Sequence, residues 1–351
     1  MNSAAYNELD DALAVLAPYD GLGNHGPMVA EALCALDRGD AAVAWTERYV
    51  NRFKFLQKRS APANRVDDDD WRDALGKFDR LEDWSQFFSH ELDESPWPDV
   101  LDRWVARLAP GFSAVALHGP IRTCHAVRAL AERDSSIRRK ELADGLAHWA
   151  AGFQLLPSGT SNRPRLLPSR AILEIETIPA NERLDPVSLV RALKDLDDFR
   201  PFSGVIAEVE LTCETDAILS DLTQTFAAAY LSNGVDFFSV FGFIHAVTGP
   251  SALRMIAPHV SETTLREALR YAWQAAAGLY ARFGGNAPIS EIPVDRFDSD
   301  GLIDRAVASD DEHAIKFTEA CLREFSLNPR SAFIAAAPHA VDFLSRARGS
   351  S

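Results

Sequence analysis

The sequence predicts an all-α or mostly α protein, a multi-helix array of two lobes with few or no strands. Apolar residues recur at helical spacing along most of the 351 residues, which is typical of amphipathic helices. Strand patterns never alternate regularly with helix patterns, as a doubly wound parallel sheet would require. The chain also contains no internal repeat, so a single array of helices is the simplest architecture.

The N-terminal segment predicts three helices. Apolar residues from Tyr6 to Leu16 fall close to one helical face. After a glycine-rich loop, Asn24 can cap a second helix, which places His25 at a helix start. Residues 45–56 predict the third helix, with aromatic side chains at i, i+4 spacing.

The pattern then breaks. Residues 57–100 hold a run of four aspartates and several prolines, which favours a solvated surface excursion with one short helix over 71–78. A loop rich in proline and serine at 158–170 is either a lid or a linker. The β-branched run 171–178, which prolines flank, is the one plausible strand. Helical pattern otherwise continues, over 100–108, 113–130, 138–153, most of 206–243, 262–281, 311–325 and the residues after Pro338.

Charge and hydropathy exclude several classes of protein. The chain has 51 acidic and 36 basic side chains, so its net charge of −15 repels nucleic acid and anionic membranes. It lacks an uninterrupted apolar stretch of about 18 residues. Its first residues lack the basic segment with which a secretory signal begins, so we expect a cytoplasmic protein. We expect the four scattered cysteines to be reduced and packed in the core.

Residues 21–26 match the pattern GxGxxG, but a helix precedes them where a dinucleotide site needs a strand. A turn between helices is therefore predicted. The chain lacks the GxSxG, GxxxxGK[ST] and HExxH patterns that mark common hydrolases and nucleotide-binding proteins.

The nine histidines are the main candidates for chemistry, because imidazole is the commonest metal ligand in proteins. His118 ends an apolar run and precedes Gly-Pro, so it is either a ligand that points into a cavity or a buried capping residue. His125 follows by about two helical turns. We expect surface or capping roles for the histidines at 90, 148, 259 and 339.

His245 lies in an almost wholly apolar stretch. A neutral imidazole there must find a hydrogen-bond partner or a metal, so the residue is either a satisfied core histidine or a ligand. In the second case, an aromatic-lined pocket beside it would select a flat apolar substrate. The candidate substrate-binding residues are Phe237, Phe238, Phe241 and Phe243.

His313 and Lys316 share one face of a predicted helix, at i, i+3 spacing, with Asp310 or Asp311 as its cap. A surface pair is the default interpretation. However, the apolar residues between and after them leave little polar face for these two side chains.

Four short segments, in this order along the chain, resemble the questin oxidase-like family: NHGPM at 24–28, HGPIRTCHAVRA at 118–129, FIHAVT at 243–248 and DEHAIKFTEA at 311–320. The resemblance spans nearly the whole chain and implies one helical domain over residues 1–351. Fungal members of this family are oxygenases that act on anthraquinones in aromatic polyketide pathways.

The resemblance implies that His25, His118, His245 and His313 bind one metal in a central cavity, together with Lys316. Burying several histidines is costly without a metal, and imidazole ligands with open coordination suit non-haem Fe(II) that binds O2. Lys316 is then either a carbamate ligand, formed when CO₂ adds to the neutral amine, or a charged group just outside the ligands. We also take Lys316 and His125 as catalytic candidates, although His125 departs from the fungal pattern.

We therefore expect a non-haem iron oxygenase that acts on a quinone, hydroquinone or phenol, by ring cleavage or Baeyer–Villiger-type oxygen insertion. Its partners would be a small aromatic substrate and O2, with NADPH as a further reductant although the chain carries no motif for it. The alternative is a metallohydrolase that uses a metal-activated water. A helical binding protein without a metal is the third hypothesis.

Overall fold

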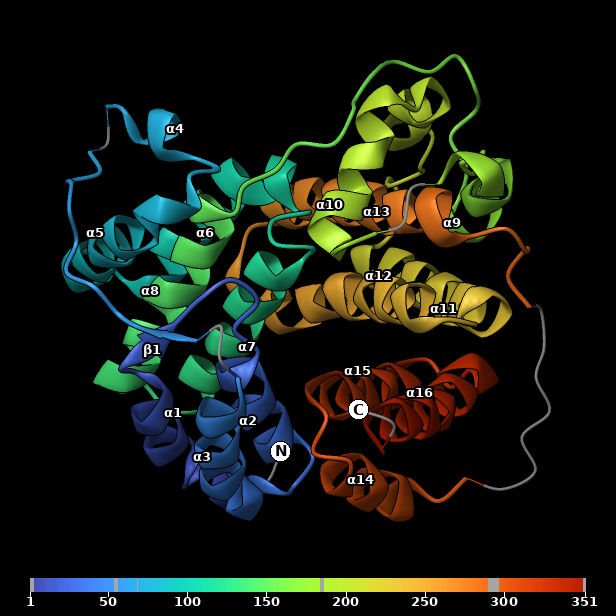
Figure 1. Ribbon diagram of the computed structural model, residues 1–351. Coiled ribbons are helices and arrows are strands. Elements are labelled where there is room, and N and C mark those ends of the chain that lie inside the picture. The colour runs from blue at the N-terminus through green and yellow to red at the C-terminus, as the bar shows by residue number, and fades with distance from the viewer. Residues whose placement is uncertain (1–2, 54–55, 68, 184–185, 290–296, 350–351) are drawn as a thin grey trace. The chain divides into compact units, whose positions relative to one another are not determined.

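The computed structural model describes residues 3–53, 56–67, 69–183, 186–289 and 297–349. The predicted fold class is confirmed, because helices account for most of these residues (Figure 1). Within the described ranges, the paired strands are only β1 (Tyr19–Asp20) and β2 (Gln57–Lys58), which are antiparallel. The chain divides into two compact units: unit 1 comprises residues 1–154 and 255–264, and unit 2 comprises residues 155–254 and 265–351.

Unit 1 is organised around α8, which packs against both α7 and α5, while α2 packs on α7. Four tryptophans in its core, Trp45, Trp84, Trp104 and Trp149, are fully buried. Its α-helices are α1 (Leu9–Leu16), α2 (Gly26–Ala35), α3 (Ala42–Arg52), α4 (Trp71–Ala74), α5 (Leu81–Glu94), α6 (Trp97–Leu108), α7 (His118–Glu132) and α8 (Ser136–Ala151). Its 3-10 helices are Ser3–Tyr6, Gly39–Ala41, Phe78–Arg80, Ala109–Gly111 and Ala257–His259.

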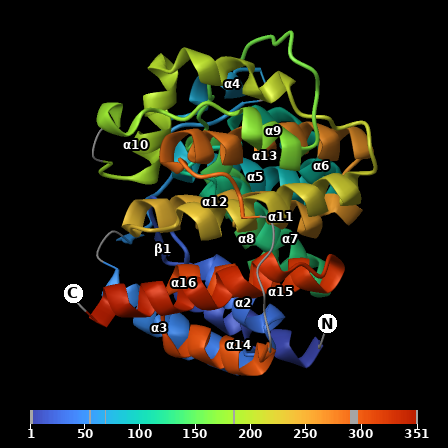
Figure 2. The same ribbon diagram turned by 90° about the vertical axis from the view of Figure 1, so that its right-hand side faces the viewer.

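In unit 2, α15 and α16 lie side by side, and α11 packs on α16 (Figure 2). Its α-helices are α9 (Pro168–Ala171), α10 (Leu189–Lys194), α11 (Thr215–Asn233), α12 (Phe237–Ile256), α13 (Glu262–Phe283), α14 (Ser299–Ala308), α15 (Glu312–Leu327) and α16 (Ser331–Gly349). The last residues of α12 and the first of α13 belong to unit 1. Its 3-10 helices are Ile172–Glu174, Ala180–Glu182, Asp195–Asp198 and Arg200–Ala207.

One segment, Phe237–His259, is long and apolar enough to cross a membrane, judged by length and composition. However, 83% of its apolar window is buried inside the protein, which is also what a core helix of a soluble protein shows. The segment carries His245, one of the candidate ligands.

Three expectations about the elements are wrong. The solvated excursion over 57–100 holds for its first part only, because Trp84, Phe88 and Leu92 form a buried i, i+4, i+8 stripe along α5. The last helix begins at Ser331 and runs through Pro338, whose missing N–H interrupts one helical hydrogen bond without ending the helix.

The strand over 171–178 is the third error, because residues 168–174 form helical turns. Pro168 occupies the first turn of α9, where proline needs no N–H partner, so it starts a helix there and does not bound a strand. Cys213 is exposed, whereas the other three cysteines are buried as predicted.

Candidate metal centre

His25 is the N-cap residue of α2 in unit 1 and is buried. Its backbone N–H donates to the hydroxyl of Tyr49 at 2.8 Å. Asn24, the predicted cap, precedes the cap position by one residue, and its Oδ1 accepts from the backbone N–H of Gly26 at 3.0 Å. These bonds fix the backbone on both sides of the imidazole, so the ring is held at a helix start as the sequence indicates.

His118 is the first residue of α7, and an unusual turn delivers it there. Val115, Ala116 and Leu117 have φ angles of 50°, 52° and 72°, in the left-handed region that residues with a Cβ avoid. Nδ1 of His118 lies 2.5 Å from the carbonyl oxygen of Val115. This contact assigns the proton to Nδ1, so Nε2 carries the lone pair that a metal would use.

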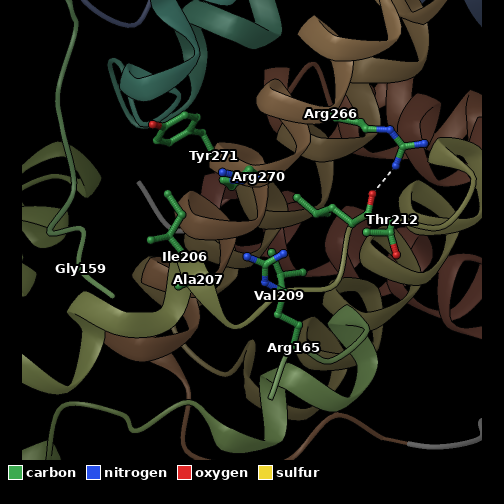
Figure 3. A pocket seen from close by; sticks show the side chains of 10 residues that line it. Gly159, Arg165, Ile206, Ala207, Val209, Thr212, Arg266, Arg270 and Tyr271 are labelled. Atoms are coloured by element: carbon green, nitrogen blue, oxygen red, sulfur yellow. Dashed lines mark hydrogen bonds between the residues drawn. The ribbon is translucent and has the colours of Figure 1, made fainter. Parts of the chain in front are cut away.

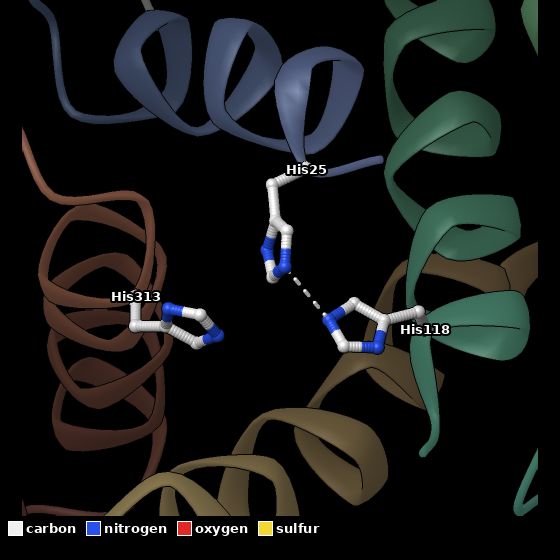
Figure 4. A group of neighbouring side chains, drawn as sticks. All are labelled: His25, His118 and His313. Atoms are coloured by element: carbon white, nitrogen blue, oxygen red, sulfur yellow. Dashed lines mark hydrogen bonds between the residues drawn. The ribbon is translucent and has the colours of Figure 1, made fainter. Parts of the chain in front are cut away.

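The two imidazoles of unit 1 meet each other. Their Nε2 atoms are 3.1 Å apart, and the rings lie edge to face with centroids 4.4 Å apart (Figure 4). Because Nε2 of His118 is an acceptor, the pair needs either a proton on Nε2 of His25 or a cation that both nitrogens share. Figure 4 also labels His313, which belongs to α15 of unit 2.

His245 lies on α12 in unit 2, with 1% of its surface exposed. Its Nδ1 is 2.7 Å from the carbonyl oxygen of Phe241, so here too the proton belongs on Nδ1 and the lone pair on Nε2. Burial and the nearby charge of Lys316 lower its pKa to about 3. The ring is therefore neutral at pH 7, the state in which histidine binds metals.

The N-terminus of α15 brings His313 and Lys316 beside His245. Asp311 caps this helix, as predicted, and its carboxylate accepts from the backbone N–H groups of His313 at 2.9 Å and Ala314 at 3.0 Å. The His313 ring lies 5.3 Å from that of His245, centroid to centroid. Burial lowers the pKa of Lys316 to about 7 against the opposing effect of nearby acidic residues.

Three of the four candidate substrate-binding phenylalanines form a row that ends at His313. Phe237 is 50% exposed, and the centroid of its ring lies 4.3 Å from that of Phe241. The centroid of the Phe241 ring lies in turn 4.2 Å from that of the His313 ring. Phe238 meets Phe237 edge to face at 5.4 Å. Phe243 is fully buried and packs with Tyr280, so it is part of the core packing of α12.

His125 is held in a buried ion-pair cluster. Its Nδ1 lies 2.5 Å from the carboxylate of Glu31, which also accepts two hydrogen bonds of 2.6 Å from Arg128 and one of 2.6 Å from Tyr6. Burial disfavours ionisation of Glu31, but Arg128 and His125 outweigh it and lower its pKa to about 2. These contacts give His125 a role in joining α7 to α2.

Sequence reasoning missed Asp20, which is buried directly before the loop that carries His25. Its carboxylate accepts from the backbone N–H of Gly21 at 2.8 Å and from the side chain of Asn24 at 3.2 Å. Burial opposes its ionisation, but Arg122, His148 and Arg59 hold its pKa well below the usual range. No local pattern distinguishes this aspartate from the many exposed ones, since its partners lie far away in the sequence.

The expectation of a surface or capping role for His148 is wrong. Its side chain is buried, and its Nε2 lies 2.8 Å from Oδ1 of Asp20. The reason is that α8 packs against α7 and α5, which leaves this part of the helix without an exposed face.

The donor set fits a transition metal. Imidazole nitrogens suit iron, zinc, copper and nickel, whereas magnesium and calcium prefer oxygen ligands. In His118 and His245, a hydrogen bond from Nδ1 to a backbone carbonyl fixes the tautomer, as is typical of metal-binding histidines. His118 in unit 1 and His245 in unit 2 are therefore each of the kind that binds such a metal.

The family model described as Questin oxidase-like matches residues 45–321, which is well over half of the chain. This range includes His118, His245, His313 and Lys316, whereas His25 precedes it. No curated protein and no solved structure matches the chain. The chain therefore belongs to the questin oxidase-like family, and this membership supports an oxidoreductase of the oxygenase type that acts on anthraquinone-type substrates.

Proposed function

We propose that the protein is a non-haem iron-dependent oxygenase that oxidises an aromatic polyketide-like substrate, by ring cleavage or Baeyer–Villiger-type oxygen insertion. One observation carries the metal assignment: buried histidines in both units have Nδ1 bound to a backbone carbonyl and the lone pair on Nε2. As the family resemblance implies, His25, His118, His245 and His313 would hold the ion. Fe(II) would supply binding and activation of O2, and the net electrons that a monooxygenase reaction needs would come from a reduced substrate or from NADPH.

The aromatic row on α12 supports a flat, apolar substrate. Phe237 is exposed on one face and contacts Phe241, which stacks at a tilt on His313. A quinone or hydroquinone ring can lie on such faces through offset or edge contacts, which contribute about 1 kcal/mol per pair beyond burial. The row would thus lead an anthraquinone-type ring toward the candidate ligands.

Lys316 would act beside the metal in one of two forms. Because burial lowers its pKa to about 7, a substantial fraction of the amine is neutral at physiological pH and can add CO2. The carbamate would supply one anionic oxygen to an otherwise all-nitrogen ligand set. Binding of ¹³CO2 should then give a carbamate carbon signal by NMR that is absent in Lys316→Met, and an unmodified lysine would indicate the charged form instead.

The central experiment measures oxygen consumption. The purified protein, loaded with Fe(II), is mixed with a panel of hydroxyanthraquinones and their reduced forms, with and without NADPH. We expect O2 uptake and incorporation of ¹⁸O from ¹⁸O2 into the product, detected by mass spectrometry. Turnover that persists without O2 and with zinc in place of iron would instead favour the metallohydrolase alternative.

A further inference from the structure

A pocket of about 550 Å³ lies in unit 2, and its lining includes no residue of α12 or α15 (Figure 3). One wall comes from α13, and the other comes from two loop segments and from the end of the 3-10 helix Arg200–Ala207. Leu166 and Val209 join these segments by a parallel β-bridge, whose two backbone hydrogen bonds each measure 2.8 Å. Its lining residues are Gly159, Arg165, Ile206, Ala207, Val209, Leu211, Thr212, Arg266, Arg270 and Tyr271.

Three of these residues are arginines, and none of the lining residues just given is acidic. The concentration of positive charge is notable in a chain whose net charge is −15. Arg266 is fixed by hydrogen bonds to the carbonyl oxygens of Leu211 and Cys213, the second at 2.8 Å. Arg165 and Arg270 are exposed, so their guanidinium groups can reach a ligand in the pocket.

Glu208, which stands between the lining residues Ala207 and Val209, accepts from the hydroxyl of Ser161 and pairs with Arg163. Two further acidic residues lie nearby and compete only weakly. Glu267 is 3.7 Å from Arg270, but both side chains are more than 40% exposed, and such pairs contribute little. Glu210 is near Arg165 and is partly exposed, and its carboxylate accepts from the backbone N–H of Thr212 at 2.6 Å. The electrostatic potential inside the pocket therefore stays positive.

We propose that this pocket binds an organic anion, a flat ring that carries a phosphate or carboxylate group. Arg165 and Arg270 would bind the anionic group, because a guanidinium offers paired donors that match phosphate and carboxylate oxygens. The ring would lie against Tyr271 and the apolar side chains of Ile206 and Val209. The volume lies within the range of about 300–1,000 Å³ that small-molecule sites occupy.

The test uses isothermal titration calorimetry at low ionic strength with the whole protein. Adenosine monophosphate probes a phosphate and salicylate probes a carboxylate, while adenosine and benzyl alcohol are their neutral counterparts. We expect one anion to bind, and its affinity to fall at least about tenfold in Arg165→Gln/Arg270→Gln and when salt is raised. Arg330→Gln removes another exposed arginine of unit 2, outside the pocket, and should leave the affinity unchanged.

Binding of the phosphate or of the carboxylate would each support the proposal and would identify the preferred anionic group. Three results would overturn it: no binding of either anion up to about 5 mM, affinity that the double variant leaves unchanged, or equal affinity for the neutral counterpart. Circular dichroism melting checks that the double variant is folded. Oxygen uptake does not depend on these arginines in the proposed function, so failure here would leave that proposal intact.

Discussion

Nδ1 of His118 lies 2.5 Å from the carbonyl oxygen of Val115, across a turn in which three consecutive non-glycine residues have positive φ. Left-handed backbone costs such residues about 1–2 kcal/mol each, and it persists where the surrounding packing enforces it. Here the turn is buried, and Gly119 approaches α8 so closely that a Cβ would lie 2.7 Å from Cα of Trp149. The packed turn therefore holds the imidazole of His118 in a defined orientation, at the cost of backbone strain.

Ala116→Gly should reveal this strain. Glycine adopts a φ of +52° without steric cost, so the substitution relieves the strain at this residue. This relief offsets two losses, the larger entropy of glycine in the unfolded chain and one buried methyl group. We expect an unchanged or slightly higher free energy of unfolding in urea. The matched variant Ala106→Gly, at an exposed position inside α6, should lose about 1 kcal/mol. Equal losses in the two variants would contradict the interpretation of strain.

The Glu31 cluster should make stability depend on acid pH. In the folded protein the pKa of Glu31 is about 2, whereas in the unfolded chain it is near 4.5, so its contribution is complete above about pH 5. As pH falls from 4.5 toward 2, the unfolded state binds the proton first, and about 3 kcal/mol should be lost. The measurement is the free energy of unfolding between pH 2 and 6.

Glu31→Gln should remove this part of the pH dependence. It should also destabilise the protein by about 3–5 kcal/mol at pH 7, because Arg128 and His125 lose their buried counter-charge. Asp134→Asn breaks an exposed pair with Arg139 and should cost less than about 1 kcal/mol. An unchanged acid profile in the Glu31 variant would assign the pH dependence to other carboxylates.

Asp20 should position the loop that carries His25. Asp20→Asn and Asp144→Asn both weaken the same buried ion-pair network through Arg59, so both should lower the free energy of unfolding. Asp20 alone of the two bonds the side chain of Asn24 and the backbone of Gly21. We therefore expect only Asp20→Asn to weaken metal binding, by about tenfold, in a competition titration with a chelator. Equal metal affinities in the two variants would leave Asp20 a purely structural role.

Most helices, and the burial of His245, were predictable from the sequence because both leave local signals. Periodic apolar residues place α7, α13 and α15 close to their observed bounds, and the cap at Asp311 follows from its position before an apolar run. His245 stands out as the one polar imidazole in an apolar stretch. These signals lie within about one helix length.

The remaining features depend on residues that are distant in the sequence. Glu31 and His125 pair across 94 positions, and Asp20 pairs with His148 across 128, so neither pair has a local pattern. The left-handed turn before His118 contains no glycine, so no local sequence pattern predicts it. The packing of α7 against α8 enforces this backbone conformation. The strand expected at 171–178 failed because β-branched residues after a proline also suit a short helical turn.

The bound metal should depend on His245. His245→Ala should lower bound iron from about one ion per chain to a small fraction, because the variant lacks one of the imidazole nitrogens that would bind the ion. His339→Ala is the matched control: this residue is exposed, lies in the same unit and bonds the hydroxyl of Tyr230 at 2.8 Å, so the variant should keep its iron. Elemental analysis after reconstitution and desalting measures both. Full iron in His245→Ala would remove this residue from the ligand set, whereas loss in both variants would indicate that the fold, and not the ligand, retains the metal.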